Sequence, residues 1–98
     1  MGQYEIVLKP SAIEDLDRLR RYDAAAIADG IEAFLAHEPA LESKSRIKRL
    51  RGKQKADYRL RLGDCRVFYT VDAAPRRVEV LRVLHKDETA QFYEEVQP

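Results

Sequence analysis

The first pattern along the chain is the alternation over residues 3–10, QYEIVLKP, which puts Tyr4, Ile6 and Leu8 on one side of an extended segment. A period of two residues is typical of a β-strand, because successive side chains point to opposite faces. Pro10 has no backbone N–H to donate to a neighbouring strand. We therefore expect a first strand that ends before Pro10.

A first amphipathic helix is predicted to follow this strand. Ser11 and Glu14 have the spacing of a capping box, in which each side chain bonds a backbone N–H of the first helical turn. Ser11 is therefore the expected cap of the helix. The predicted inner side consists of Ile13, Leu16 and Leu19, and the predicted solvent side carries Glu14, Asp15, Asp17 and Arg18.

A second helix is predicted after a break at residues 20–22, with Asp23 as its cap. Its apolar positions recur at the spacing i, i+4, i+7 and i+8, which forms one face of a helix. Gly30 is expected to let the two helices approach closely. The short connection indicates an antiparallel helical hairpin. The apolar face of the second helix consists of Ile27, Ile31, Phe34 and Leu35.

Strand patterns crowd together in the second half of the chain. The segments 58–62 and 65–72 flank residues 63–64, Gly-Asp, a two-residue turn that suits a tight hairpin. In the segment 77–85 the alternation breaks, as expected for a central strand that is buried on both faces. The remaining predicted elements are a basic connector over 38–57, a short strand around 47–50 and a short terminal helix over 87–96.

This order of elements predicts an α+β fold, in which the N-terminal strand and the helical hairpin pack on one face of a small, largely antiparallel sheet. A chain of 98 residues suffices for a single modest core, so we expect residues 1–98 to form one domain. We expect Tyr58 and Tyr69 in that core. The opposite face of the sheet is predicted to stay open.

The net charge of +1 conceals a strong asymmetry along the chain. Residues 44–66 carry ten Lys and Arg against two Asp, a balance of +8, and the other residues carry eight basic and fifteen acidic side chains, a balance of −7. Such a separation is typical of a polyanion-binding surface on an acidic body. A solvated basic loop is the alternative interpretation.

Arginines alternate along the predicted hairpin. Arg59 and Arg61 share one face of their strand, since they are two residues apart. With the valines of the next strand packed inward, Arg66 and Phe68 are expected on the same open face. Guanidinium groups bind phosphate in a bidentate manner and aromatic rings stack on bases. This face therefore suits the backbone of single-stranded RNA.

Cys65 is the only cysteine, which excludes an internal disulfide, and no Cys or His spacing indicates a metal site. Its place at the start of a predicted strand favours a packed thiol over a nucleophile. The chain has neither the roughly 20-residue apolar run of a membrane span nor the pattern of a signal peptide. We therefore expect a cytoplasmic protein without a bound metal or cofactor.

Three segments, IKRLRG from Ile47, DYRLRLGDCRVFYTVD from Asp57 and RVEVLRVLHKDETAQFY from Arg77, resemble the RelE/ParE superfamily of type II toxin–antitoxin toxins. The resemblance extends over nearly the whole chain. RelE-like members are ribosome-dependent endoribonucleases that cut mRNA in the ribosomal A site, whereas ParE-like members poison DNA gyrase. The resemblance implies a RelE-like fold and a cognate antitoxin bound in a hetero-oligomer. For the RelE branch it further implies mRNA on the ribosome, with contacts to rRNA.

The resemblance also implies a set of site residues. Asp87 departs from the RelE pattern, which has an arginine there, and this departure favours the ParE alternative. The positions that match the catalytic pattern of RelE are Arg59, Arg61, Arg66, His85 and Tyr93. Further RNA contacts are expected from Lys48, Arg49, Arg51, Lys53, Lys55, Phe68 and Lys86.

Cleavage by attack of the RNA 2′-hydroxyl needs a base, an acid and cations, and without a metal the side chains must supply all three. Arg61 and Arg66 are expected to stabilise the charge of the phosphorane. Arginine stays protonated and is a poor base, so His85 and Tyr93 are the acid–base candidates. A plain surface histidine and a core or base-stacking tyrosine are the alternatives. We expect a translation-inhibiting mRNA endoribonuclease, with a gyrase inhibitor or a non-toxic antitoxin-binding partner as alternatives.

Overall fold

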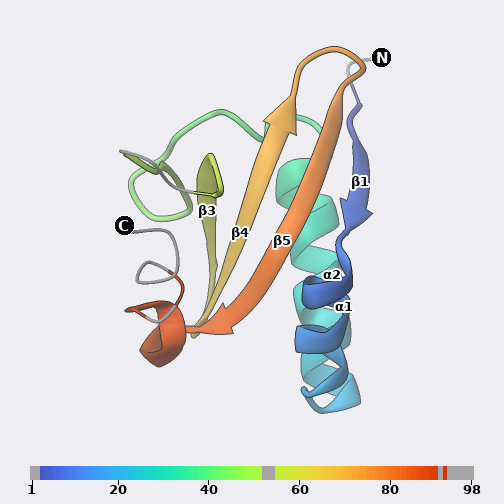
Figure 1. The fold of residues 1–98 in the computed structure, drawn as a ribbon, viewed down its shortest axis with the longest axis vertical. Coiled ribbons are helices and arrows are strands. Elements are labelled where there is room, and N and C mark those ends of the chain that lie inside the picture. Colours follow the sequence, from blue (N-terminus) through green and yellow to red (C-terminus); the bar gives the residue numbers. More distant parts are fainter. Residues whose placement is uncertain (1–2, 52–54, 91, 93–98) are drawn as a thin grey trace.

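The computed structural model describes residues 3–51, 55–90 and 92 (Figure 1). Two helices come early in the chain, and most of the strands follow them, as the sequence patterns predict. The elements are β1 (Glu5–Leu8), α1 (Pro10–Asp17), α2 (Arg21–Leu35), β2 (Ile47–Arg49), β3 (Tyr58–Leu62), β4 (Cys65–Asp72), β5 (Arg77–His85) and the 3-10 turn η1 (Lys86–Glu88).

The strands form one five-stranded sheet in the order β1-β5-β4-β3-β2. β1 pairs with β5 in parallel, and the other three pairings are antiparallel. The sheet is thus largely antiparallel, and the predicted α+β class is confirmed. β5 lies between β1 and β4, which confirms that it is an interior strand.

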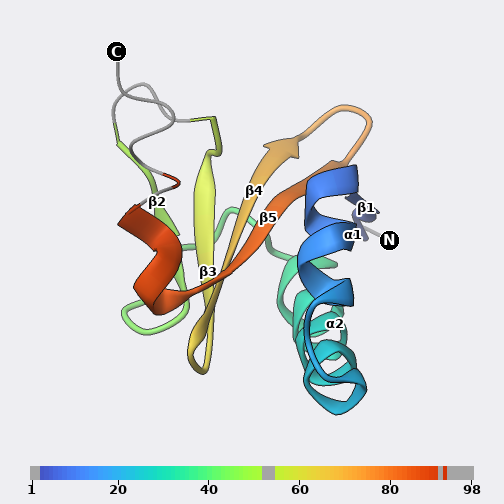
Figure 2. The same cartoon turned by 60° about the horizontal axis from the view of Figure 1, so that its bottom comes forward.

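The main core lies between the sheet and the two helices, which lie side by side on one face (Figure 2). The prediction that Tyr58 and Tyr69 belong to this core is confirmed, since their exposed fractions are 8% and 0%. Their rings stack with centroids 5.6 Å apart. The Tyr69 hydroxyl donates a hydrogen bond of 2.6 Å to the carbonyl oxygen of Pro39, which ties the segment after α2 to the sheet.

The predicted start of the first helix is wrong. α1 begins at Pro10 with Lys9 as its N-cap, and no side chain caps it, so the Ser11–Glu14 capping box does not form. Proline replaces the cap because its fixed φ suits the first helical position and it has no N–H left to satisfy there. The predicted inner face is correct for Leu16 and Leu19, which pack against the core. Ile13, in contrast, is 45% exposed, and Asp15, predicted to face solvent, is buried.

The second helix begins two residues before its predicted cap, at Arg21 with Arg20 as N-cap. Asp23 therefore lies in the first turn, where a negative charge is favourable next to the helix N-terminus. The prediction that Asp23 caps the helix is wrong.

The predicted apolar face of α2 is confirmed for Ile27, Ile31 and Leu35, which are buried. Phe34 is 37% exposed. Gly30 is close to the sheet rather than to the other helix, because a Cβ built there would lie 2.8 Å from Cδ1 of Leu62. The glycine thus sets the distance between α2 and β3.

A β-bulge interrupts the pairing of β4 with β5. Phe68 lies opposite Arg82 and Tyr69 opposite Val80, so Leu81 is the extra residue. A bulge shifts the side-chain alternation by one position. Val80 and Val83 can therefore both join the core under the helices. In the sequence, the alternation of β5 is broken, which we attributed to burial on both faces. In the structure, this break coincides with the bulge.

The second face of the sheet is partly covered. The segment η1 lies on the side opposite the helices (Figure 2). Phe92 packs against Phe68, which projects from that face. Of the terminal helix predicted over 87–96, the described part is the turn Lys86–Glu88, followed by helical residues 89–90. Residues 93–98 lie outside the described residues. No helix in the described part of the chain is long and apolar enough to span a membrane.

Candidate nucleic-acid interface

Four cations share the face of the sheet that the helices leave uncovered. Lys48 lies directly opposite Arg59 in the β2–β3 ladder, and Arg61 lies opposite Arg66 in the β3–β4 ladder. Directly opposite residues of an antiparallel pair project from the same face. Leu60, between the two arginines of β3, points to the helical side and is fully buried. We call Lys48, Arg59, Arg61 and Arg66 the arginine face.

The positive charge of the arginine face is not neutralised by the protein around it. Within residues 3–51, 55–90 and 92, no acidic side chain forms an ion pair with Arg59, Arg61 or Arg66. Partial burial, followed by the charges of Arg61 and Arg59, lowers the pKa of the Arg66 guanidinium below its ordinary value. Like charges held this close repel one another, so an anion bound between them would relieve the repulsion.

The hairpin turn fixes one of these guanidinium groups. Nη1 of Arg66 donates to the carbonyl oxygens of Gly63 at 2.9 Å and of Cys65 at 3.0 Å. Gly63 has a φ of +58°, which a tight turn accepts readily only from glycine. In contrast, the Nε of Arg59 is buried without a hydrogen-bond partner in the described structure. An unsatisfied buried donor costs stability, and because this nitrogen is enclosed by protein it offers no contact to a ligand in this conformation.

The prediction that Phe68 offers an open platform for a base is wrong. Phe68 projects from the correct face but is fully buried. Its ring stacks on that of Phe92, with centroids 4.2 Å apart and an interplanar angle of 18°. The Phe92 ring therefore occupies the place where we expected a base.

The structure does not bring His85 onto the arginine face. His85 lies opposite Cys65 in the β4–β5 ladder, on the side of the sheet that faces the helices. Its Nδ1 accepts a hydrogen bond of 3.1 Å from the backbone N–H of Asp87, so the imidazole caps η1. Cys65 is half-buried, as predicted, and burial is the main cause that raises the pKa of its thiol. The candidate Tyr93 lies outside the described residues.

The remaining predicted RNA contacts are dispersed. Nζ of Lys86 lies 3.7 Å from Oδ1 of Asp64, so its charge is partly balanced at the β3–β4 turn. Arg49 points toward Tyr58, with its guanidinium 5.8 Å from the ring centroid. Arg51 and Lys55 are exposed, and Lys53 lies outside the described residues.

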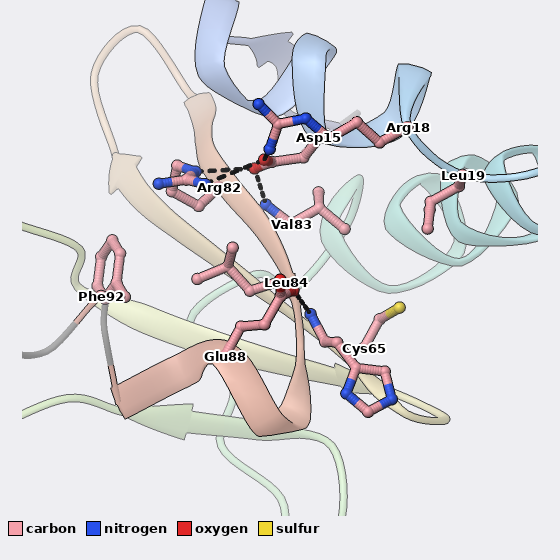
Figure 3. A pocket seen from close by; sticks show the side chains of 10 residues that line it. Asp15, Arg18, Leu19, Cys65, Arg82, Val83, Leu84, Glu88 and Phe92 are labelled. Atoms are coloured by element: carbon pink, nitrogen blue, oxygen red, sulfur yellow. Dashed lines mark hydrogen bonds and ion pairs between the residues drawn. The ribbon is translucent and has the colours of Figure 1, made fainter.

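Sequence reasoning missed a buried ion pair between α1 and β5. Nε and Nη2 of Arg82 donate to the Asp15 carboxylate at 2.8 and 3.0 Å, and the backbone N–H of Val83 donates to it at 2.8 Å (Figure 3). β1 pairs with residues 77–80 of β5, so the carboxylate bonds an N–H on the edge of β5 that β1 leaves uncovered, while β4 pairs with the other edge. The spacing of Ala12, Asp15 and Leu19 along one helical face was the available signal.

Comparison with known proteins agrees with this architecture. The family model described as the ParE toxin of the type II toxin–antitoxin system parDE matches residues 6–90. The chain therefore belongs to this family of toxins, within the RelE/ParE superfamily. No curated protein sequence matches the chain.

Solved structures of RelE toxins share the fold. The RelBE2 toxin–antitoxin complex of Mycobacterium tuberculosis has 28% identity and a TM-score of 0.75, with 87% of this chain and 93% of that chain covered. The RelE–RelB complex of Pyrococcus horikoshii has 25% identity and a TM-score of 0.69, with 88% and 97% covered. A mutant of Escherichia coli RelE in the free state, at 20% identity and a TM-score of 0.68, covers 96% and 94% and supports the fold alone. The chain is thus a type II toxin with a RelE-like fold.

Proposed function

We propose that this toxin is a ribosome-dependent endoribonuclease that cuts mRNA and thereby inhibits translation. The observation that supports the proposal most directly is the arginine face, whose cations have no acidic partner among the described residues. Uncompensated guanidinium groups on a sheet face are suited to a chain of phosphates, because each can bind a phosphate through two parallel hydrogen bonds.

The proposed reaction needs no group other than the RNA and the protein. The 2′-oxygen attacks the adjacent phosphorus and the bond from phosphorus to the 5′-oxygen breaks, which leaves a 2′,3′-cyclic phosphate and a 5′-hydroxyl. A base takes the proton of the 2′-hydroxyl and an acid gives a proton to the leaving oxygen. The extra negative charge on the phosphorane is the quantity that nearby cations stabilise.

We assign the charge stabilisation to Arg61 and Arg66, which lie opposite each other next to the hairpin turn. The two hydrogen bonds that Arg66 donates to the turn preorganise its guanidinium. Arg59, which projects from the same face of β3 as Arg61, is assigned to a neighbouring phosphate. Tyr93 is our first candidate for proton transfer, because it matches a position of the RelE catalytic pattern. His85 is the second candidate, and its position on the helical side weighs against it.

We propose that the partner of the free toxin is a cognate antitoxin in a hetero-oligomer. Structures similar to this chain are toxin–antitoxin complexes of RelE with RelB. Acidic side chains of such a partner would complement the arginine face and compete with RNA for it.

A gyrase inhibitor is the second candidate function. The family model that matches the chain is that of ParE toxins. In addition, the exposed Asp87 stands close to His85, with 3.4 Å between Oδ2 and Nδ1, where the RelE pattern has a cation. An anion at that position weakens phosphate binding.

Primer extension on an mRNA in a purified translation system, with and without ribosomes, tests the proposal. We expect cuts only with ribosomes, and upstream fragments that end in a cyclic phosphate. A supercoiling assay with purified DNA gyrase runs in parallel. Gyrase-linked DNA breaks without mRNA cuts would overturn the proposal in favour of the second candidate, and neither effect would favour a non-toxic binding partner.

A further inference from the structure

We propose that a pocket at the start of α1 binds a nucleoside 5′-phosphate. Binding there requires neither a ribosome nor RNA cleavage, so this site extends beyond the proposed function. The pocket has a volume of about 460 Å³ and lies where the chain passes from β1 into α1. This part of the chain is held beside β5 (Figure 2), because the backbone N–H of Lys9 donates to the carbonyl oxygen of Val80 at 2.9 Å.

Two lysines give the pocket a positive charge. Lys9 comes from the start of α1 and Lys55 from the segment before β3, and both are exposed. Within residues 3–51, 55–90 and 92, neither lysine forms an ion pair, and none of the side chains that line the pocket is acidic. Arg82 also lines the pocket, with its Nε and Nη2 bonded to Asp15. The two ammonium groups therefore have no counter-anion among the described residues.

Apolar side chains form another part of the pocket. Leu81, the extra residue of the bulge in β5, lines it together with Phe92, and the two belong to the same small cluster. Ser11 also lines it, and since this side chain does not cap α1, its hydroxyl is left to donate to a ligand. The pocket thus combines cations with apolar surface, which suits a charged group attached to an organic body.

A phosphate monoester is the charged group that matches two lysines. It carries a charge of about −1.5 to −2 and three acceptor oxygens, and each ammonium group offers three donors. A carboxylate brings a single charge, as does a phosphodiester within an RNA strand. The free oxygens of a 5′-phosphate therefore complement Lys9 and Lys55 better than either of these groups.

The volume of the pocket requires more than a phosphate. Ligand sites for small molecules span about 300–1,000 Å³, and this pocket lies within that range. The sugar and base of a nucleotide supply a body of this kind, which the surface of Leu81 and Phe92 can contact. These two side chains have no hydrogen-bonding groups with which to read the edge of a base, so we expect similar affinities for the four nucleotides.

The pocket is separate from the arginine face. Leu81 lies three residues before Leu84, which is opposite Arg66 in the β4–β5 ladder. A strand rises about 3.3 Å per residue, so roughly 10 Å of strand separates the two positions. A nucleoside 5′-phosphate has two sources at this distance, a free nucleotide and the phosphorylated 5′ end of an RNA strand that crosses the arginine face.

The test titrates the purified toxin with AMP and with adenosine and follows the backbone amides by NMR. We expect AMP to bind at least about tenfold more tightly than adenosine. Lys9→Ala and Lys55→Ala should each lower the AMP affinity at least about tenfold, the typical effect of losing one charge-assisted hydrogen bond. Lys9→Arg keeps the charge and should retain binding. Lys44→Ala, which removes an exposed lysine outside the pocket, is the matched control and should bind like wild type.

Uridine trinucleotides with a 5′-phosphate or a 5′-hydroxyl distinguish the two sources. Binding of the phosphorylated trinucleotide that depends on Lys9 identifies an RNA end as a ligand, and Lys9-dependent binding of AMP without it identifies a free nucleotide. Either result supports the site. Far-UV circular dichroism checks that the variants fold.

Three outcomes would overturn the inference. They are no binding of AMP, equal binding of AMP and adenosine, and an equal loss of affinity in Lys9→Ala and Lys44→Ala. A fourth is a loss of AMP binding in Arg66→Ala but not in Lys9→Ala, since it would place the phosphate on the arginine face instead.

Discussion

Replacing Asp15 with alanine perturbs the contact that joins α1 to the second half of β5. Its carboxylate is 4% exposed and accepts hydrogen bonds from the Arg82 guanidinium and from the Val83 backbone N–H. Alanine removes all of these acceptors at once. The helix itself should tolerate the change, because alanine has the highest helix propensity.

The size of the loss in stability follows from two groups, the Val83 N–H and the Arg82 guanidinium, which both lose the Asp15 carboxylate as their acceptor. An unsatisfied buried N–H such as that of Val83 costs about 1–3 kcal/mol. Breaking a fully buried ion pair costs about 3–5 kcal/mol, but the Arg82 side chain is 26% exposed, so water recovers part of that cost. We expect Asp15→Ala to lower the free energy of unfolding by about 3 kcal/mol. For a domain of this size, the midpoint temperature should fall by roughly 12–24 °C.

Thermal and urea unfolding followed by circular dichroism measure this change. Asp17→Ala, exposed on the same helix, is the matched control and should change stability by less than about 0.5 kcal/mol. In an Arg82→Met background, Asp15→Ala should cost less, because the guanidinium is no longer there to lose its partner. If Asp15→Ala behaves like Asp17→Ala, the buried ion pair does not hold α1 to β5 and the reasoning is refuted.

Three further predictions concern the turn, the core and the arginine face. Gly63→Ala should cost about 1–2 kcal/mol in urea unfolding, because its φ of +58° is strained for alanine; an unchanged midpoint would contradict the turn geometry. Burial raises the pKa of Tyr69 above its ordinary value of 10.0, so the folded state holds this proton more tightly than the unfolded state. The stabilisation is complete below pH 10.0 and is lost as the pH rises above it. In unfolding curves recorded between neutral and alkaline pH, Tyr69→Phe should therefore remove this decrease in stability at high pH. Arg61→Ala should weaken RNA binding and make the slope of log K against log salt shallower by about 0.7, one phosphate contact, whereas an unchanged slope would exclude Arg61 from the interface.

The strands of the second half of the chain were predictable because their signals are local. β3, β4 and β5 have the predicted bounds, since alternation and the Gly63 turn depend only on neighbouring residues. The shared face of Arg59 and Arg61 was predictable for the same reason. The predicted helix starts were less accurate. Pro10 and Ser11 both favour the start of a helix, and the sequence does not show at which of them the helix begins.

The errors at the candidate site arise from contacts between distant segments. Asp15 is buried because Arg82, 67 residues further along the chain, donates to it. Phe68 is covered by Phe92, which no pattern within the strand indicates. The side on which His85 lies depends on the bulge at Leu81, since one extra residue reverses the alternation of everything after it.

The central claim is that the arginine face holds the backbone of an mRNA while it is cut. Primer extension with ribosomes, comparing wild type, Arg66→Ala and Arg21→Ala, tests it most directly. Arg21 is exposed at the start of α2 and does not belong to the arginine face. The account predicts that Arg66→Ala loses at least about 100-fold in cutting rate, the typical effect of removing one donor from a developing anion, while Arg21→Ala cuts normally. Equal cutting by both variants would contradict the claim.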